Sequence, residues 1–159
     1  MDRRAFLKAG ALMVATLPLA AYMEQEIPDP VAPVHIQNDD PGWAVLNGAK
    51  LDIDAERGLM TAAFTPEIRA FEGKPFRIGG FMLPLDARTS FTHFVLTRRN
   101  TTCSFCPPNE LTEAIEIFSL SELTFTADEY VVSGIFETIA DSAEGLFYRL
   151  RDARVERLL

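Results

Sequence analysis

The sequence predicts a single all-β domain, either a closed barrel or a sandwich. Short segments in which apolar and polar residues alternate are joined by turn residues, which is typical of such folds. Glycines stand inside two of these segments, at Gly79-Gly80 and at Gly134, where they favour a bulge or a sharp bend. No helical pattern is long enough for repeated βαβ units. The chain of 159 residues has room for one domain with its own core and a leader.

Residues 1–21 have the composition of an export signal. Arg3, Arg4 and Lys8 form a basic start, and the segment 9–21 that follows is uncharged and ends in small residues. That run is short for a membrane span, which takes about 20 residues. The stretch from Arg3 to Lys8 is similar to the twin-arginine motif, with Asp2 in the place of the usual Ser or Thr. We therefore expect a twin-arginine-type signal peptide, passage through the twin-arginine translocase and a periplasmic location.

Residues 22–42 are rich in proline and acidic side chains, and their prolines prevent a continuous helix. We expect an extended tether or a segment that lies over the domain, with the domain itself covering 43–159. Within it, Thr65-Pro66-Glu67 predicts one short helical turn, because Thr is a good N-cap and Pro suits the first helical position. The predicted strands lie in 59–64, 75–86, 91–98, 113–120, 129–138 and 145–158.

The charge of the chain limits its partners. The formal net charge is −8, and the residues after the basic leader are more acidic still. Phosphate backbones would be repelled by such a domain, so we expect no nucleic-acid partner. An anionic membrane surface is disfavoured for the same reason, whereas cations and basic protein surfaces are favoured. We also expect no transmembrane domain once the signal is removed.

Several spaced elements resemble a family of small exported bacterial proteins of uncharacterised function. They are Trp43-x-x-Leu46, the strand Ile78 to Leu85 with its G-[FY]-M-x-P-L pattern, Phe94 to Leu96, and a Cys/Pro-Pro-Asn loop. The similarity covers roughly 43–155. It implies a small OB-like, partly open barrel and an association with envelope transport systems, some of them linked to metals. In the family the loop commonly reads C-x-H before the prolines, whereas here Phe105 takes the His position and Cys106 is added.

Cys103 and Cys106 form a C-x-x-C pair with Pro107-Pro108 directly behind it. A disulfide would close a very short ring and stiffen the loop. Zinc or copper is the second candidate, because two thiolates from one turn reach one ion. A thiol-disulfide redox pair is the third, and a plain loop with free thiols is the fourth.

Further metal ligands are few. His93 could add an imidazole and Met82 a thioether, so both are candidate ligands beside the cysteines. Each also has a purely structural role available, His93 as a strand residue and Met82 as a core residue. Weaker candidates are His35, Asp86 and Glu110.

No serine–histidine set, phosphate loop or paired carboxylates stand at a useful spacing, so the sequence favours a non-enzymatic role over catalysis. We expect an exported binding or accessory protein of the cell envelope, with a soft metal ion held through Cys103 and Cys106 as one candidate role. The alternatives are a thiol-disulfide redox protein that uses the same pair and a structural partner in an envelope transport complex.

Overall fold

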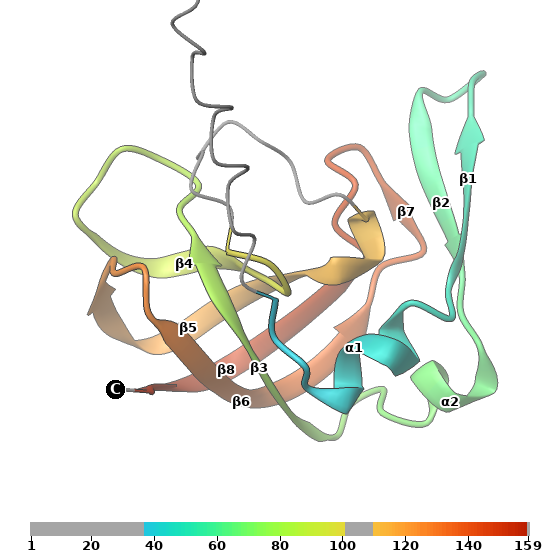
Figure 1. Cartoon of the computed structure of the whole chain (residues 1–159). Helices are drawn as coiled ribbons and strands as arrows, with labels where there is room; N and C mark the ends of the chain where they lie inside the picture. Colours follow the sequence, from blue (N-terminus) through green and yellow to red (C-terminus); the bar gives the residue numbers. More distant parts are fainter. Residues whose placement is uncertain (1–36, 101–109, 159) are drawn as a thin grey trace, which may run out of the picture. The chain divides into compact units, whose positions relative to one another are not determined.

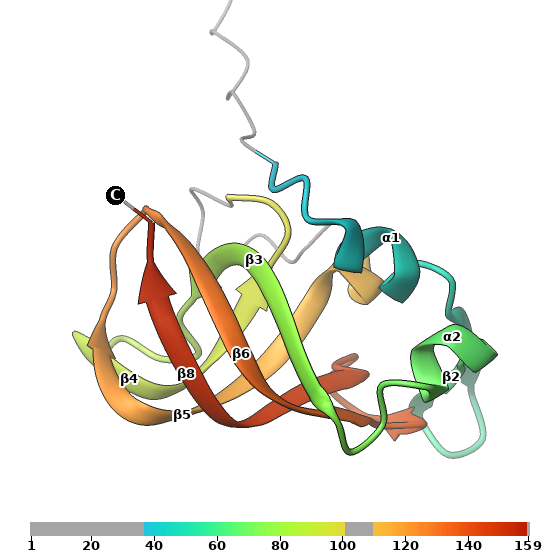
Figure 2. The ribbon, with the colours of Figure 1, turned by 90° about the horizontal axis from the view of Figure 1, so that it is seen from below.

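A computed structural model describes residues 37–100 and 110–158, and most of them belong to β-strands. Five strands form a closed barrel in the order β3-β4-β5-β8-β6. They are β3 (Pro75–Leu83), β4 (Ser90–Thr97), β5 (Ala114–Thr124), β6 (Glu129–Thr138) and β8 (Tyr148–Arg157). Figure 2 shows these strands curling around a common axis. The prediction of a small all-β barrel is confirmed.

The strand order makes the barrel OB-like. β3, β4 and β5 follow one another as antiparallel neighbours, whereas the last strand, β8, lies between β5 and β6. It pairs parallel with β5 and antiparallel with β6, and β6 pairs with β3 to close the ring. This is a five-stranded Greek-key arrangement, as in the OB fold. The barrel is closed, which is one of the two arrangements that the strand pattern predicted, whereas the family resemblance implied a partly open barrel.

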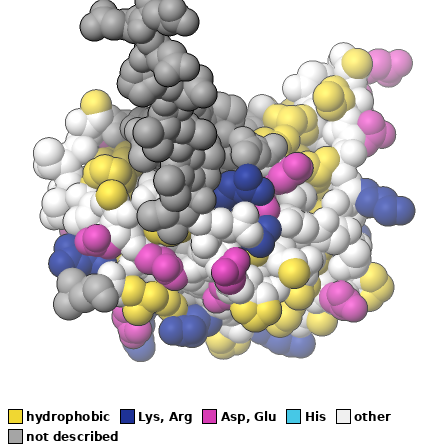
Figure 3. Space-filling model, in the orientation of Figure 1, with side chains coloured by type: hydrophobic (Ala, Val, Ile, Leu, Met, Phe, Trp, Pro, Cys, Tyr) yellow, Lys and Arg dark blue, Asp and Glu magenta, His cyan; other side chains and the backbone are white. Residues whose placement is uncertain are grey.

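A small second sheet has the order β1-β2-β7. Its strands are β1 (Lys50–Asp54), β2 (Leu59–Ala63) and β7 (Asp141–Ser142), and β1 and β2 form a hairpin. Figure 1 shows this hairpin projecting beside β7, away from the barrel strands. Figure 3 shows hydrophobic and acidic side chains together on it, and Ile53 is its most exposed large apolar residue.

The predicted helical turn after Thr65 is confirmed as α2 (Pro66–Arg69), where the Thr65 hydroxyl accepts a hydrogen bond from the Ile68 amide at 3.3 Å. The described residues also contain a second helix, α1 (Pro41–Leu46), and a 3₁₀ turn, η2 (Leu111–Glu113). α1 begins in the same way, because the Asp40 carboxylate accepts from the Gly42 amide at 2.8 Å. No helix in the described ranges has the length and apolar character needed to cross a bilayer.

The core fills the barrel and continues beneath the two helices. Aromatic rings dominate it, and Trp43, Tyr148 and Phe136 are among its largest fully buried side chains. The Trp43 indole donates to the Gly79 carbonyl at 2.8 Å, and the Tyr148 hydroxyl donates to the Leu46 carbonyl at 2.6 Å. Burial raises the pKa of Tyr148, so this hydroxyl keeps its proton and remains a donor. These two bonds fasten α1 to the barrel.

Gly79 and Gly80 do not form the bulge that the sequence suggested, because the pairing of β3 with β6 runs through both without a shift. They permit close approach instead. A Cβ on Gly80 would lie 2.6 Å from the Thr97 carbonyl oxygen, and one on Gly79 would lie 2.7 Å from the Asn38 amide nitrogen. Asn38 is buried, and its backbone amide donates to the Arg98 carbonyl at 2.9 Å. The described end of the 22–42 segment therefore lies on the barrel.

The other predicted bend is present. The register between β6 and β8 shifts between Ser133 and Ile135, on either side of Gly134. The opposite residue, Asp152, has φ of 51°, which is unusual for a residue with a side chain. The pairing of β5 with β8 shifts at the same level, between Ile117 and Ser119. In both pairings β8 carries one residue more than its partner, so one bulge on β8, at Arg151 and Asp152, accounts for both shifts.

Replacing Gly80 with alanine should destabilise the barrel by about 1–3 kcal/mol, because the new methyl group must displace the backbone of β4. Denaturant unfolding of the purified variant measures this. Gly73→Ala is the control for backbone strain alone, since φ is 69° there but no atom lies within 4 Å of its Cβ. A Gly80→Ala variant as stable as the parent chain would contradict the close packing.

Candidate functional site

The two candidate cysteines, Cys103 and Cys106, lie outside the described residues. The other two candidate ligands lie on neighbouring strands of the barrel but on opposite sides of its wall. Met82 is buried in the core, which is the structural role that the sequence offered for it, whereas His93 points outward from β4. The structure therefore does not bring Met82 and His93 together. Across the described ranges no group of three or more His, Cys, Asp and Glu side chains is arranged to hold a metal ion.

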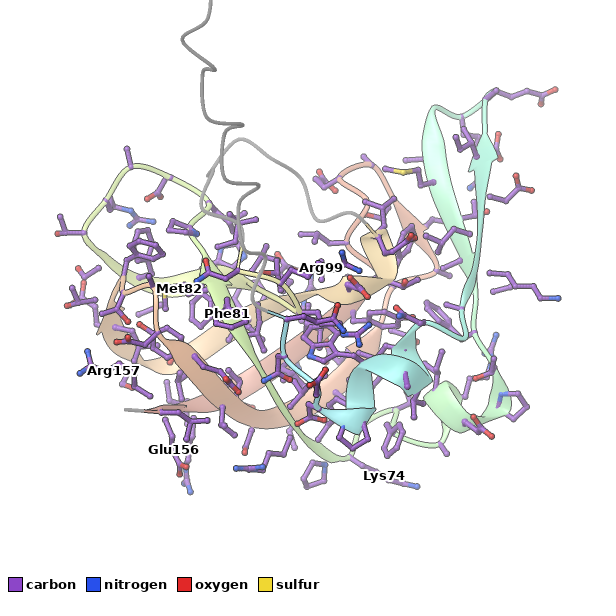
Figure 4. All side chains as sticks on the ribbon, in the orientation of Figure 1. Lys74, Phe81, Met82, Arg99, Glu156 and Arg157 are labelled. Carbon is purple, nitrogen blue, oxygen red and sulfur yellow. The ribbon has the colours of Figure 1, made fainter. Side chains whose placement is uncertain are left out.

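The residues on either side of 101–109 form a buried ionic cluster. The Glu113 side chain is only 3% exposed, and its Oε1 atom accepts from Arg98 Nη1 at 2.8 Å. Arg99 Nε lies 3.3 Å from Glu113 Oε2, although neither of these buried atoms makes a hydrogen bond within the described residues. The Arg98 amide also donates to the Glu113 carbonyl at 3.1 Å. Figure 4 shows Arg99 at the end of the barrel where η2 leads into β5.

This cluster closes the base of the segment that carries the cysteines. Glu113 also accepts from the Asn47 side chain at 3.3 Å, and Thr112 donates to the same amide group at 2.8 Å. Asn47 is the C-cap of α1, so the cluster links the helix to β4 and β5. An arginine pair around one buried carboxylate is stable only while all of the partners are present, because an unpaired buried charge is costly.

A second cluster lies on the outer face of β4, β5 and β8, and it includes His93. Glu116 accepts from His93 Nε2 at 2.8 Å through Oε1, and from Arg149 Nε at 2.8 Å through Oε2. The Phe118 ring stacks on the His93 imidazole at 4.4 Å between centroids, and the Arg149 guanidinium lies 5.2 Å from the same ring. The four side chains thus form a closed ring of contacts across three strands.

Three of these side chains, His93, Glu116 and Arg149, form one wall of a pocket of about 620 Å³. Its apolar lining residues are Leu85, Val95, Ile139, Ala143 and Leu146. The other polar lining residues are Asp141, Ser142 and Glu144. The volume lies in the range of small-molecule sites.

A second hollow of about 490 Å³ shares Arg149 with the first. It is lined by Phe118, Ser119, Leu120, Arg151 and Asp152. The β8 bulge at Arg151 and Asp152 lies at this level, and both of its residues line the hollow. Phe118 and Leu120 are among the exposed large apolar residues of the chain.

Sequence reasoning identified His93 but missed Glu116, Phe118 and Arg149. The alternation of polar and apolar residues in the sequence could have identified two of these residues. Glu116 and Phe118 alternate with buried isoleucines in a predicted strand, so both had to face outward. Arg149 carried no such signal, because its contact with Glu116 depends on the parallel pairing of β5 with β8.

The comparisons with known proteins do not identify a function for the chain. No family model matches the chain, and no curated protein matches it. Among solved structures, the chain is similar to the crystal structure of a DUF3299 family protein from Pseudomonas aeruginosa PAO1. The identity is 18%, the match covers 62% of this chain and 68% of the other, and the TM-score is 0.49. A likeness at this level carries no inference about function, and the OB-like assignment depends on the strand order of the barrel.

Replacing Glu113 with glutamine should lower the free energy of unfolding by about 3 kcal/mol, because two arginines would lose their only carboxylate in this cluster. Denaturant unfolding measures the change. Asp86→Asn is the matched control, since it breaks the fully exposed pair with Arg88 and should leave stability unaltered. Equal effects of the two substitutions would contradict a structural role for the Glu113 cluster.

Proposed function

We propose that the chain is an exported, non-enzymatic accessory protein of the cell envelope that binds a small ligand in the pocket on the outer face of β4, β5 and β8. The observation that carries this proposal is the fixed His93–Glu116–Arg149 network at an apolar pocket of about 620 Å³. Glu116 has only 13% of its side chain exposed and is held from both sides. A carboxylate held by an arginine and a histidine is a rigid polar wall, which is what a selective binding site requires.

Three features favour binding over catalysis at this pocket. Both oxygens of Glu116 are occupied by donors, so the carboxylate is not free to act as a base. No serine, threonine or cysteine among the described lining residues stands beside His93 as a nucleophile, since Ser142 is buried and accepts from the Leu146 amide at 3.0 Å. The outer face of the second and third barrel strands is also where OB folds bind their ligands.

A pocket-filling substitution tests this function. Ala143→Trp places an indole in the pocket, whereas Ala87→Trp places one on the exposed loop between β3 and β4, away from the lining. In ligand-observed NMR with a panel of small fragments, the parent chain and Ala87→Trp should bind a common set that Ala143→Trp loses. An unchanged set in Ala143→Trp, or no bound fragment in any of the three, would contradict the pocket as the binding site.

The cysteine pair supports a second proposal, a soft metal ion held by Cys103 and Cys106. The Arg98–Glu113 pair and the backbone bond beside it join the two ends of the segment, so the described residues provide a firm base for a ligand-bearing loop. Thiolates favour zinc and Cu(I), and two of them supply half of a closed zinc site. The same base would also serve a thiol-disulfide redox protein or a structural partner of a transport complex.

One set of variants tests both export and metal. The parent chain should reach the periplasmic fraction with bound zinc or copper, measured by elemental analysis after anaerobic purification. A variant with Arg3→Lys and Arg4→Lys should stay in the cytoplasm, because the twin-arginine route requires the arginine pair. A variant with Cys103→Ser and Cys106→Ser should be exported without metal. Unchanged export of the first variant, or equal metal in the parent and the second, would refute the respective claim.

A further inference from the structure

The charged side chains around the pocket differ in how strongly they are paired with other side chains. Arg149 donates through Nε and Nη2 to a single oxygen of Glu116, at 2.8 and 2.7 Å, and His93 Nε2 donates to the other oxygen. Arg149 is therefore already paired with Glu116, which is the most buried carboxylate of the pocket. An incoming anion would have to compete with Glu116 for Arg149.

The other two carboxylates of the pocket, Asp141 and Glu144, form weaker ion pairs or none within the described residues. Glu144 is exposed and makes no ion pair or hydrogen bond within the described residues. Asp141 is 48% exposed, and its partner Arg57 approaches it only at 3.3 and 3.5 Å from the hairpin outside the pocket. Both carboxylates stand on the segment that forms one rim, beside the apolar side chains of Ile139 and Leu146. The pocket thus combines an apolar interior with an acidic rim.

We propose that the ligand is a small organic cation with an apolar body, held with the body against the apolar walls and the positive group at Asp141 and Glu144. This inference depends on the proposed binding function of the same pocket. The net charge of −8 acts in the same direction, because it raises the local concentration of cations around the chain. A pocket of about 620 Å³ can take an ammonium group with a chain or ring of drug-like size.

Three decyl compounds that differ only in the head group test the sign of the charge. Isothermal titration of the full chain is carried out with decyltrimethylammonium, decanoate and a neutral decyl glucoside, each below its critical micelle concentration. We expect the cation to bind about tenfold more tightly than the neutral compound and the anion to bind most weakly. High salt should reduce the difference, because the rim carboxylates are partly exposed.

A matched pair of double variants separates the rim from the overall charge. Asp141→Asn with Glu144→Gln removes two charges at the pocket, and Asp52→Asn with Glu56→Gln removes two from the exposed hairpin. The rim variant should bind the cation about tenfold less tightly, whereas the hairpin variant should bind as the parent does. Circular dichroism and unfolding curves check that both variants fold.

The outcomes distinguish this inference from the proposed function. If decanoate binds more tightly than the cation and Ala143→Trp abolishes that binding, the pocket is a binding site but the cationic class is wrong. Equal losses in the rim and hairpin variants would also overturn the inference, because overall charge would then explain the preference. If fragments of the panel bind but no decyl compound does, the cationic ligand is again rejected, and the pocket is still supported as a binding site.

Discussion

Gly79 and Gly80 on strand β3 have no side chains, and the close approach that they permit is the constraint on which the rest of the described structure depends. At Gly79 and Gly80 the strand comes close enough for the Asn38 amide and the Thr97 carbonyl to approach its backbone. The Trp43 indole packs against the same place and donates to the Gly79 carbonyl. Two segments, the stretch from Asn38 to Trp43 and strand β4, therefore meet on these two residues. A side chain on Gly80 would push β4 away from β3, and one on Gly79 would displace Asn38.

Glu113 and Glu116, near the start of β5, each form the centre of one candidate region. These regions are the cluster beside the cysteine-bearing segment and the polar wall of the pocket. Glu113 is held by arginines from the end of β4, and Glu116, three residues later, is held by His93 and Arg149. Each carboxylate is nearly buried, and its burial is tolerable because arginine side chains from other parts of the barrel pair with it. The first cluster closes the base of the cysteine-bearing segment. The second forms the polar wall of the pocket, so one short stretch of sequence supports both proposals.

The barrel could be predicted because alternation and glycine placement are local signals. Phe76, Ile78 and Met82 face inward as their spacing requires, and Gly134 lies opposite the bulge on β8. α1 was missed, although Asp40-Pro41 repeats the cap-and-proline pattern that identified α2. The pocket could not be predicted, because Glu116 and Arg149 meet only through a parallel strand pair, and sequence spacing does not encode that pairing. Glu116 and Phe118 could have been placed on the outer face from the alternation in β5, whereas the position of Arg149 beside them depends on this pairing.

The position of β8 has a consequence for folding during synthesis. β8 is the last of the described barrel strands along the chain, yet it lies between β5 and β6 and supplies Arg149 to the pocket. The barrel cannot close, and the pocket cannot form, until β8 has been synthesised. A chain that stopped before β8 would leave one edge of β5 and one edge of β6 unpaired, and unpaired strand edges favour aggregation.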